Sequence, residues 1–381
     1  MAHKWIREGL RLADAVRKFG HPIALAERYK YLYRDRRFSP NEIRFFRLLD
    51  PALDRTSLAR FVSKEELLEV QRSLNPPSLH VWTEDKLEFH LRCVREGLRV
   101  PRLVGALSPR RYDGLSVPVA QSARELVELL GASEDRTLIL KPVAGVHGDG
   151  VTRLVRSPDG WIDASGAPFT AARFERMVTT SGYEAWMLQE ELVGHPALHE
   201  FSDTSGLQTC RIVTFLADAG DVEILAARLR LICGDSARDN FSYGTTGNVI
   251  ANLDPGTGRI VSAVTGTGRD PEIVSVAVHP RTKRELVGFA VPDWPSATAL
   301  ALRAARAFAP LRTIGWDVAI TPDGACLIEG NVTWDTLSGD PRMGEIHRRL
   351  AAECRRSGAQ TEEPEARRTP IPDDDAVQQN Q

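Results

Sequence analysis

The chain has 381 residues and a mass of 42.2 kDa, more than one hydrophobic core usually organises, so we expect two or three lobes. Its 49 Lys and Arg residues nearly balance its 51 Asp and Glu residues, and the formal charge of -2 excludes the global cationic field of a nucleic-acid binder. With 42% apolar and 26% charged residues, the composition also excludes wholesale disorder.

Cysteine spacing and the length of the apolar runs bear on the compartment. The odd number of cysteines and the absence of any CxxC pair indicate neither a disulfide framework nor a zinc ribbon. Charges are scattered through the first twenty residues, and no apolar run approaches membrane-spanning length. We therefore expect a cytoplasmic protein with reduced thiols and no transmembrane segment.

Residues 1–76 are rich in helix formers and lack an alternating strand pattern, which predicts a small helical lobe. This lobe is basic, because residues 1–72 contain sixteen Lys and Arg against ten Asp and Glu. An apolar stripe at helical spacing is formed by Trp5, Ile6, Gly9, Leu12, Ala13, Val16 and Phe19. The stripe either packs on the rest of the protein or brings residues 1–20 into peripheral contact with an anionic membrane surface.

After Asn75-Pro76-Pro77, a capping box at residues 83–86 predicts a helix that ends near Glu96. Strand-like and helical segments then alternate, which predicts a mixed α+β body. The expected strands are 136–141, 151–155, 186–192, 208–215 and 222–231, and the expected helices are 171–180 and 296–308. Residues 356–381 have almost no large apolar side chains and predict a disordered acidic tail.

The strand at 138–142 delivers Lys141 directly before a loop that contains Gly145, His147, Gly148 and Gly150. Glycines let backbone N–H groups approach a phosphate, and a lysine borne by a strand supplies the matching positive charge. A Gly-rich hairpin turn beside an incidental lysine is the alternative interpretation. The segment is not the eight-residue P-loop, because its lysine precedes the glycines.

Residues 314–331 predict a β-hairpin whose Pro-Asp-Gly centre suits a type I turn, with the glycine in the αL bulge position. In the resulting three-residue loop Thr321 faces Ala325, and counting outward places Asp317 opposite Glu329. The apolar face of the hairpin is then expected to carry Trp316, Val318, Ile320, Cys326 and Ile328.

Two opposed carboxylates repel each other and need a compensating cation. Asn331 lies two residues beyond Glu329 on the same face of the strand, and this oxygen-rich set suits a Mg²⁺ ion that also holds substrate phosphates. A solvated polar face on an edge hairpin is the alternative, because a one-residue change of register would separate Asp317 from Glu329.

Arginines lie between these two segments. Arg228 and Arg230 share one face of an apolar strand, Arg211 lies in an earlier strand, and the Gly-rich polar loop 239–248 follows. Anion binding would account for cations on such strands. Exposure to solvent or pairing with nearby acids is the alternative for each of them.

Taken together, these residues resemble the ATP-grasp superfamily, and most closely its sugar-transfer-associated branch. The resemblance runs in order from residue 82 to residue 335. Its matching segments are Trp82-Thr83-Glu84-Asp85-Lys86, Lys141-Pro142 with the glycine loop, Gln189-Glu190, Thr209-Cys210-Arg211, Leu229-Arg230, Asp239-Asn240-Phe241, His279-Pro280, Val291-Pro292-Asp293-Trp294, Gly315-Trp316-Asp317, Glu329-Gly330-Asn331 and Trp334-Asp335. The order and spacing carry the resemblance, because single pieces are common by chance.

The resemblance implies ATP and one or two Mg²⁺ ions as cofactors. The residues that match nucleotide-binding positions are Lys141, Gly145, His147, Gly148, Gly150, Gln189, Glu190, Glu191 and Leu192. The residues that match metal ligands are Asp317, Glu329 and Asn331, and those that match positions near the γ-phosphate or an acyl phosphate are Arg211, Arg230 and Asn240. These roles agree with the physical needs of phosphoryl transfer, which are positioning and charge neutralisation.

The resemblance also implies a division of the chain. Residues 77–136 form the segment before the ATP-grasp body, 137–195 its small lobe and 196–355 its large lobe with the metal site. Many relatives open with a Rossmann-like domain, whereas residues 1–76 here are predicted to be helical. The loop Gly244-Thr245-Thr246-Gly247 stands where Gly-Gly is usual, and its threonines either contact the acceptor or stiffen the loop.

The function implied is an ATP-dependent carboxylate–amine ligase that forms an amide through an acyl phosphate, with small-molecule substrates and a link to cell-surface polysaccharide by analogy. A phosphotransferase acting on a hydroxyl is the alternative. A nucleotide-binding partner protein without turnover is a third hypothesis, and the complete phosphate and metal set argues against it. The sequence indicates neither the two substrates nor the oligomeric state.

Overall fold

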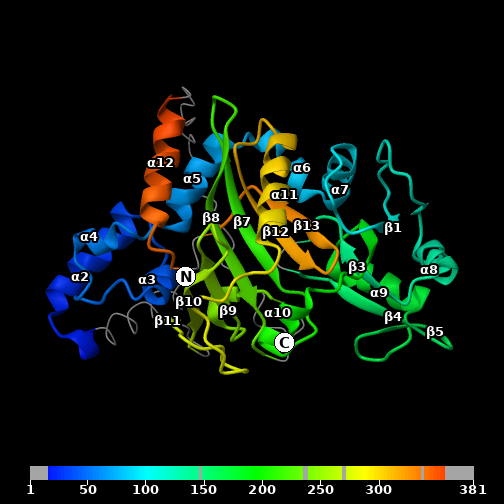
Figure 1. Cartoon of the computed structure of the whole chain (residues 1–381), viewed down its shortest axis with the longest axis horizontal. Helices are drawn as coiled ribbons and strands as arrows, with labels where there is room; N and C mark the ends of the chain where they lie inside the picture. Colours follow the sequence, from blue (N-terminus) through cyan, green and yellow to red (C-terminus); the bar gives the residue numbers. More distant parts are fainter. Residues whose placement is uncertain (1–15, 146–147, 235–238, 268–271, 336–338, 357–381) are drawn as a thin grey trace.

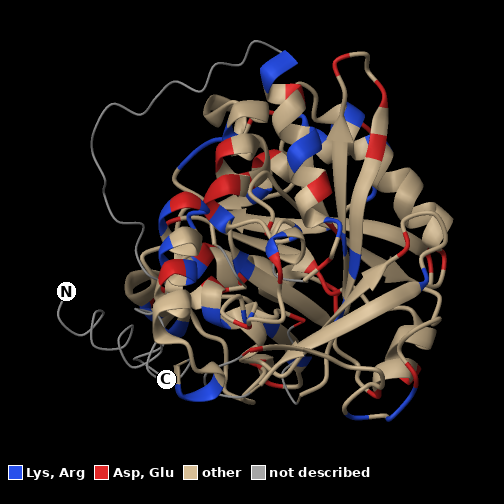
Figure 2. Ribbon diagram, turned by 90° about the vertical axis from the view of Figure 1, so that its left-hand side faces the viewer, with Lys and Arg blue, Asp and Glu red and all other residues tan. Residues whose placement is uncertain are grey.

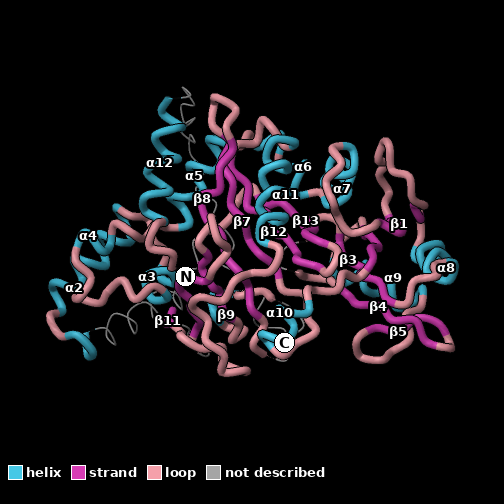
Figure 3. Tube along the Cα trace, viewed as in Figure 1, coloured by secondary structure: helices cyan, strands magenta, loops and turns pink. Residues whose placement is uncertain are grey.

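Two β-sheets carry the fold, which is described here from a computed structural model over residues 16–145, 148–234, 239–267, 272–335 and 339–356. In Figure 1 the smaller sheet lies at the right, the larger sheet at the centre, and the N-terminal helices with the last helix at the left. Helices flank both sheets (Figure 3), so the α+β class predicted from the sequence is confirmed.

The smaller sheet has six strands in the order β2-β1-β6-β3-β4-β5 over the described residues. Their bounds are β1 Leu103–Leu107, β2 Val119–Ala120, β3 Thr137–Pro142, β4 Thr152–Ser157, β5 Gly160–Asp163 and β6 Trp186–Glu190. Helices α8 (Ala123–Ala132) and α9 (Ala171–Ser181) cover one face through side chains such as Leu126 and Phe174, which pack with Leu138, Leu140 and Trp186. Side chains that alternate with these, such as Lys141, therefore lie on the opposite face.

Within the described part of the chain, the larger sheet has seven strands in the order β11-β10-β9-β8-β7-β12-β13, all paired antiparallel. Their bounds are β7 Thr209–Leu216, β8 Val222–Leu231, β9 Val249–Leu253, β10 Ile260–Gly266, β11 Ile273–Ser275, β12 Thr313–Thr321 and β13 Gly324–Asn331. Helices α7 (Lys86–Arg95) and α11 (Trp294–Ala307) cover one face and form the largest apolar cluster with it. Helix α10 (Pro196–Ser202) also contributes to this cluster.

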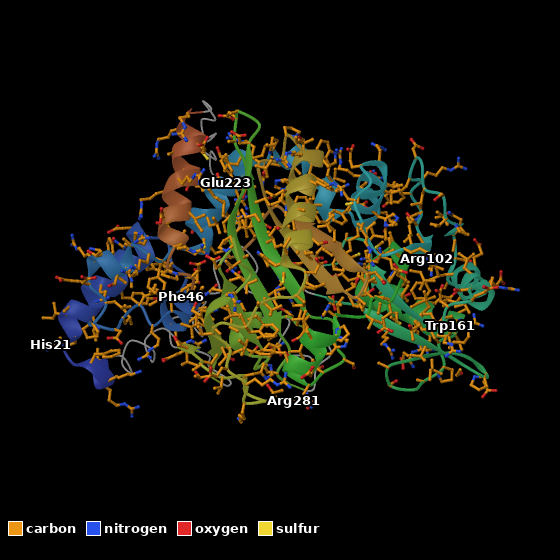
Figure 4. The ribbon with its side chains drawn as sticks, viewed as in Figure 1. His21, Phe46, Arg102, Trp161, Glu223 and Arg281 are labelled. Carbon is orange, nitrogen blue, oxygen red and sulfur yellow. The ribbon has the colours of Figure 1, made fainter. Side chains whose placement is uncertain are left out.

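Helices of the N-terminal region pack against the other face of the larger sheet. The helical elements up to α7 are α2 Pro22–Lys30, the π-helix η1 Tyr31–Asp35, α3 Pro40–Phe45, α4 Arg55–Leu58, α5 Lys64–Leu74, the 3-10 helix η2 Pro77–Leu79 and α6 Val81–Glu84. Phe45 and Phe46 pack with Phe241, Ile250 and Val264, and Figure 4 shows Phe46 between these helices and the sheet. The predicted helical region is therefore present, and it is part of the packing of the sheet.

Two buried amides tie α5 to the larger sheet. Asn75 is fully buried, and its side chain donates to the carbonyls of Thr313 (2.7 Å) and Val332 (3.3 Å) and accepts from the N–H groups of Arg312 and Thr313. Gln71 donates to the carbonyl of Trp334 at 2.8 Å. Helix α12 (Met343–Arg356) packs beside α5 over Val213 and Phe215 of β7. The N-terminal helices are thus hydrogen-bonded to the backbone at the ends of β12 and β13.

Charged side chains are interspersed on this side of the molecule. Figure 2, which faces the N-terminal helices, shows Lys and Arg alternating with Asp and Glu. Arg36 pairs with Glu66 and Arg37 with Glu69, which explains why a basic composition does not become one cationic face. Most of the predicted apolar stripe lies in residues 5–13, outside the described residues, and Val16 and Phe19 are half-buried. The predicted tail beyond Arg356 also lies outside them.

Local capping moves one predicted boundary. The expected helix begins at Lys86, because the Asp85 carboxylate accepts the N–H groups of Leu87 and Glu88 as its N-cap. The predicted capping box at Thr83 is therefore wrong, since a separate short helix, α6, ends at Glu84. Over the part of the chain that the structure describes, no helix is both long and apolar enough to cross a membrane.

The β12–β13 hairpin confirms one predicted residue pairing but has a different loop length and a different register near the turn. Asp317 lies opposite Glu329 as expected, but Thr321 pairs with Gly324, so the three-residue loop is wrong. A β-bulge between this turn and Asp317 inserts the missing residue and restores the register. The bulge also exchanges the faces of β13 near the turn, and Ala325 and Leu327 join the apolar cluster in place of the predicted Cys326 and Ile328.

Candidate active site

A row of polar side chains crosses the larger sheet on the face opposite α11. Cross-strand pairing places these residues side by side, so they share one face. This polar row consists of Glu329, Asp317, Arg211, Arg228, Asn252 and Ser262, one from each of β13, β12, β7, β8, β9 and β10. Charged groups at the centre of a sheet are expensive to bury, so the row marks a site with a purpose beyond packing.

Asp317 is the centre of the row and is held by two arginines. Arg211 donates to both of its carboxylate oxygens, and Nη1 of Arg230 donates to Oδ2 at 3.1 Å. Burial acts to raise the pKa of Asp317, but the charges of Arg211 and Arg230 outweigh it and hold the pKa below its usual range. Asp317 therefore stays ionised while only 4% exposed.

Glu329 and Asn331 complete the carboxylate side of the site. Burial and the neighbouring charge of Asp317 raise the pKa of Glu329, so these two groups favour a shared cation between them. The Asn331 amide donates to Glu329 Oε1 at 3.3 Å. No group of three or more His, Cys, Asp or Glu side chains is placed to hold a metal within the described ranges. A metal here would therefore rest on two carboxylates and an amide, with ligands from substrate and water.

The loop at 239–248 approaches the row through Asp239. The Asp239 carboxylate accepts the backbone N–H of Thr209 at 2.9 Å, which holds the loop against the start of β7. Burial raises the pKa of Asp239, and the charge of Arg230 opposes that shift. Asn240 directs its side-chain oxygen to the N–H of Ser242, and its carbonyl accepts from Asn248. The structure thus places Asn240 in a turn that directly follows Asp239.

Lys141 lies on the face of the smaller sheet that meets this site. Burial and the nearby charge of Lys86 lower the pKa of Lys141 to about 8, whereas Glu329 acts to raise it. Glu329 likewise acts to raise the pKa of Lys86, although burial leaves that pKa below its ordinary value. Lys141 of the smaller sheet and Lys86 at the start of α7 therefore both lie within reach of the charge of Glu329 from the larger sheet.

Lys86 is a further candidate site residue, which the sequence pattern indicated only as part of a helix start. Its ammonium group donates to the carbonyl of Gly145, and its backbone N–H donates to the carbonyl of Val143. A signal was present, because a lysine in the first turn of a helix is disfavoured by the helix dipole. A cation at that position indicates a role other than helix stability.

The glycine loop follows Pro142 and passes close to it. Gly150 has φ +70°, and a Cβ there would meet Pro142 at 2.7 Å and Trp186 at 3.2 Å, so a larger residue does not fit. Gly145 and Gly148 flank the part of the loop that includes His147, which lies outside the described residues. The loop therefore starts beside Lys141 with its backbone close to the smaller sheet.

Residues 189–192 connect the two sheets. Gln189 lies opposite Ile139 on the Lys141 face of the smaller sheet, whereas Glu190 points to the other face and accepts the N–H of Arg102 at 2.8 Å. Glu191 pairs with Arg153 at 2.6 Å. Leu192 is half-buried in the connection. This connection reaches the larger sheet at His195, whose backbone N–H donates to the carbonyl of Ile320.

A close approach explains a glycine in β12. A Cβ at Gly315 would lie 2.8 Å from Trp334 and 3.0 Å from the Arg211 side chain. Glycine at this position therefore leaves room for the Arg211 side chain, which pairs with Asp317.

A family model described as sugar-transfer associated ATP-grasp matches residues 68–340. No curated protein shows significant sequence similarity to the chain.

Solved structures similar to this chain include a biotin carboxylase from Campylobacter jejuni, with 10% identity, a TM-score of 0.44, and 72% of this chain and 47% of that chain covered. A D-alanyl-alanine synthetase A from Vibrio cholerae has 9% identity and a TM-score of 0.43, with 74% and 67% covered. An L-amino acid ligase from Bacillus licheniformis has 12% identity and a TM-score of 0.35, with 67% and 41% covered. The chain thus spans less than half the length of the first and the last of these.

Proposed function

Since the chain belongs to the sugar-transfer associated ATP-grasp family, we propose that it is an ATP- and Mg²⁺-dependent carboxylate–amine ligase. It would join a small-molecule carboxylate to an amine through an acyl phosphate, in the assembly of a cell-surface polysaccharide or a related product. The observation that carries the proposal is the polar row. Its Asp317–Glu329 pair has Arg211 and Arg230 alongside, and the charge of Glu329 acts on both Lys86 and Lys141.

The small-sheet side supplies the contacts to the nucleotide. Lys86 and Lys141 place two positive charges beside the glycine loop, where the phosphates of ATP would lie. Gln189 and the connection up to Leu192 would hold the adenine between the sheets. The position of Gln189 on the Lys141 face supports this assignment, because base and phosphates must lie on the same face.

Asp317, Glu329 and Asn331 would hold Mg²⁺. A bound Mg²⁺ ion neutralises phosphate charge during phosphoryl transfer. The donor set fits that ion, since opposed carboxylates with a raised Glu329 pKa gain from a cation between them. Asn331 would add an amide oxygen from the same strand face.

Arg211 and Arg230 would neutralise the oxygens that gain charge as the carboxylate attacks. Both are already held in place by Asp317, so little reorganisation is needed. No side chain need act as a covalent nucleophile. Burial raises the pKa of the Cys326 thiol, which lies near Lys141, to about 12, so it stays protonated and unreactive.

Trapping with hydroxylamine tests the reaction class. We expect ATP turnover that depends on a carboxylate and yields a hydroxamate when hydroxylamine replaces the amine. Release of ADP with a phosphorylated product and no hydroxamate would show a phosphotransferase instead. A panel of sugar acids and amino acids would identify the carboxylate.

The Glu329→Gln variant tests the site. We expect hydroxamate formation to fall at least about hundredfold, the scale of losing one preorganised electrostatic group. Glu223→Gln is the matched control, because Glu223 lies near the start of β8 (Figure 4), is partly exposed and pairs with Arg349. Equal rates for Glu329→Gln and the unmodified protein would remove Glu329 from the site.

A further inference from the structure

The polar row extends farther than ATP and Mg²⁺ require. Glu329, Asp317 and Arg211 are accounted for by the proposed nucleotide chemistry. Arg228, Asn252 and Ser262 continue the row over β8, β9 and β10, and Asn252 donates to Ser262 at 3.0 Å. Neighbouring strands lie about 4.8 Å apart, so the backbone of Arg228 lies two strands, about 10 Å, from that of Asp317.

Arg228 is a buried cation that the structure compensates only in part. It is 3% exposed, and Nη1 donates to the carbonyl of Asp335 at 3.0 Å and to its carboxylate at 3.2 Å. Nη2 reaches only the sulfur of Met343 at 3.7 Å, and Nε has no hydrogen-bond partner among the described residues. A guanidinium group has five donors, so its capacity is far from filled.

The surroundings leave Arg228 in need of negative charge. Arg211 lies directly opposite it on β7, and like charges opposed across a ladder repel. Burial, together with the charges of Arg211 and Arg230, lowers the pKa of Arg228, and Asp335 and Asp340 oppose that shift. Asp340 is already engaged by three donors of Arg342. The Asp335 side chain is 42% exposed, so solvent weakens the charge that it offers to Arg228.

We propose that Arg228 binds a second acidic group of the acceptor, a phosphate or carboxylate held within about 10 Å of the reacting carboxyl, and that Asp335 occupies this position when no acceptor is bound. This inference rests on the proposed ligase function and narrows its substrate class to acceptors with two anionic groups, such as a sugar acid that also carries a phosphate. Asn252 and Ser262 extend the polar surface beyond this point and suit the hydroxyl groups of such a molecule.

Binding of inorganic phosphate tests the subsite without turnover. The protein is first saturated with Mg²⁺ and a non-hydrolysable ATP analogue, which fills the positions near Arg211 and Arg230, and phosphate is then titrated by calorimetry. We expect Arg228→Met, which keeps the volume and removes the charge, to weaken phosphate binding at least about tenfold, since hydrogen bonds to charged groups are the strong ones. Affinity for the nucleotide analogue should not change.

Asp335→Asn separates this proposal from a purely structural role. If Asp335 competes for Arg228, removing its charge strengthens phosphate binding. If Arg228 only fastens Asp335 and Met343 to the sheet, both variants lower stability and neither changes phosphate affinity, and the proposal fails. Binding of glucuronic acid 1-phosphate compared with glucuronic acid and with glucose 1-phosphate then shows whether one or two anions are recognised.

If Arg228→Met does not fold, an NMR signal of the unmodified protein tests the subsite instead. The Nε–H resonance of Arg228 in the unmodified protein, assigned by its absence from Arg228→Lys, should shift on addition of phosphate. An unchanged resonance at saturating phosphate would overturn the subsite. Because none of these measurements uses turnover, their failure leaves the ligase proposal standing, and a failed hydroxamate assay leaves their result standing.

Discussion

Two neighbouring rows of the larger sheet use the same six strands in opposite ways. The polar row is followed, on the opposite face, by an apolar row under α11 that lies one residue along five of the strands and two residues along β13, where the bulge lies. The apolar row consists of Leu327, Val318, Cys210, Leu229, Ala251 and Ala263, and all six belong to one core cluster. Both rows are largely buried, but only one gains stability from burial.

Residues that contribute to stability and residues that contribute to the site therefore alternate within single strands. Arg228, Leu229 and Arg230 are consecutive, and the leucine points into the core while the arginines point to the site. Buried charges are retained against their desolvation penalty, and replacing them with apolar residues is often neutral or stabilising. The apolar row should therefore govern unfolding, and the polar row should govern ligand binding and turnover.

Asp317→Asn and Glu329→Gln should give the largest effects on turnover. They should also show that one polar-row residue, Asp317, contributes to stability although the other, Glu329, does not. Both should lower turnover at least about hundredfold. Asp317→Asn should also lower the free energy of unfolding by about 3 kcal/mol or more, because the charges of Arg211 and Arg230 stay buried without their partner. Glu329→Gln should be neutral or stabilising, since a raised carboxyl pKa means that ionised Glu329 opposes folding at neutral pH.

Urea unfolding at pH 7 without metal or nucleotide distinguishes these two variants, with hydroxamate formation measured in parallel. Equal stability losses for both variants would show that the two carboxylates are not electrostatically different. That result would contradict the assignment of Asp317 as the partner of the arginines.

Leu229→Ala tests the apolar row at a position between two site arginines. Leu229 is fully buried, and truncation of a buried leucine lowers the free energy of unfolding by about 2–5 kcal/mol. The affinity for Mg·ATP should stay within about twofold, because the backbone of β8 still positions Arg228 and Arg230. Urea unfolding measures the stability, and titration with Mg·ATP measures the affinity. A loss of binding free energy larger than the loss of unfolding free energy would show that the two rows are coupled.

Much of the site could be predicted from the sequence, because period-two alternation assigns faces without knowledge of the fold. Arg228 and Arg230 share a face as the spacing indicates, and Asp317 does face Glu329. The error at Cys326 and Ile328 came from the bulge in the hairpin, whose two-versus-one pairing leaves no sequence signal strong enough to place it.

Other features depend on long-range contacts. The clamp by Asn75 joins residues more than 230 positions apart, and no local pattern identifies such a partner. The role of Lys86 required the position of the glycine loop, since its donor reaches Gly145. The polar row could not be predicted without the order of its six strands, and strand order depends on tertiary packing.

Asn75→Ala tests whether the N-terminal helices support the polar row from outside. Four hydrogen bonds to buried backbone groups at the ends of β12 and β13 would be lost, so we expect the free energy of unfolding to fall by about 3 kcal/mol. Gln71→Leu is the graded comparison, because it loses one bond, to Trp334, and should cost about 1 kcal/mol. Equal small losses for both would show that the clamp is weak.

The smallest expected effect is a proton taken up by Lys141 when nucleotide binds. Burial and Lys86 lower the pKa of Lys141 to about 8 in the folded protein, against about 10.4 in an unfolded chain. Between these values the unfolded chain binds more protons, so stability rises with pH there, and below about pH 8 the penalty is constant because the lysine is charged in both states.

Phosphates favour the charged lysine, so binding of Mg·ATP at pH 8.5 should take up about half a proton or more. Calorimetry in two buffers of different ionisation enthalpy measures this uptake. Lys141→Arg should abolish it, because a guanidinium group stays charged throughout this range. An unchanged uptake in Lys141→Arg would assign the proton to another group, with Lys86 as the next candidate because burial lowers its pKa as well.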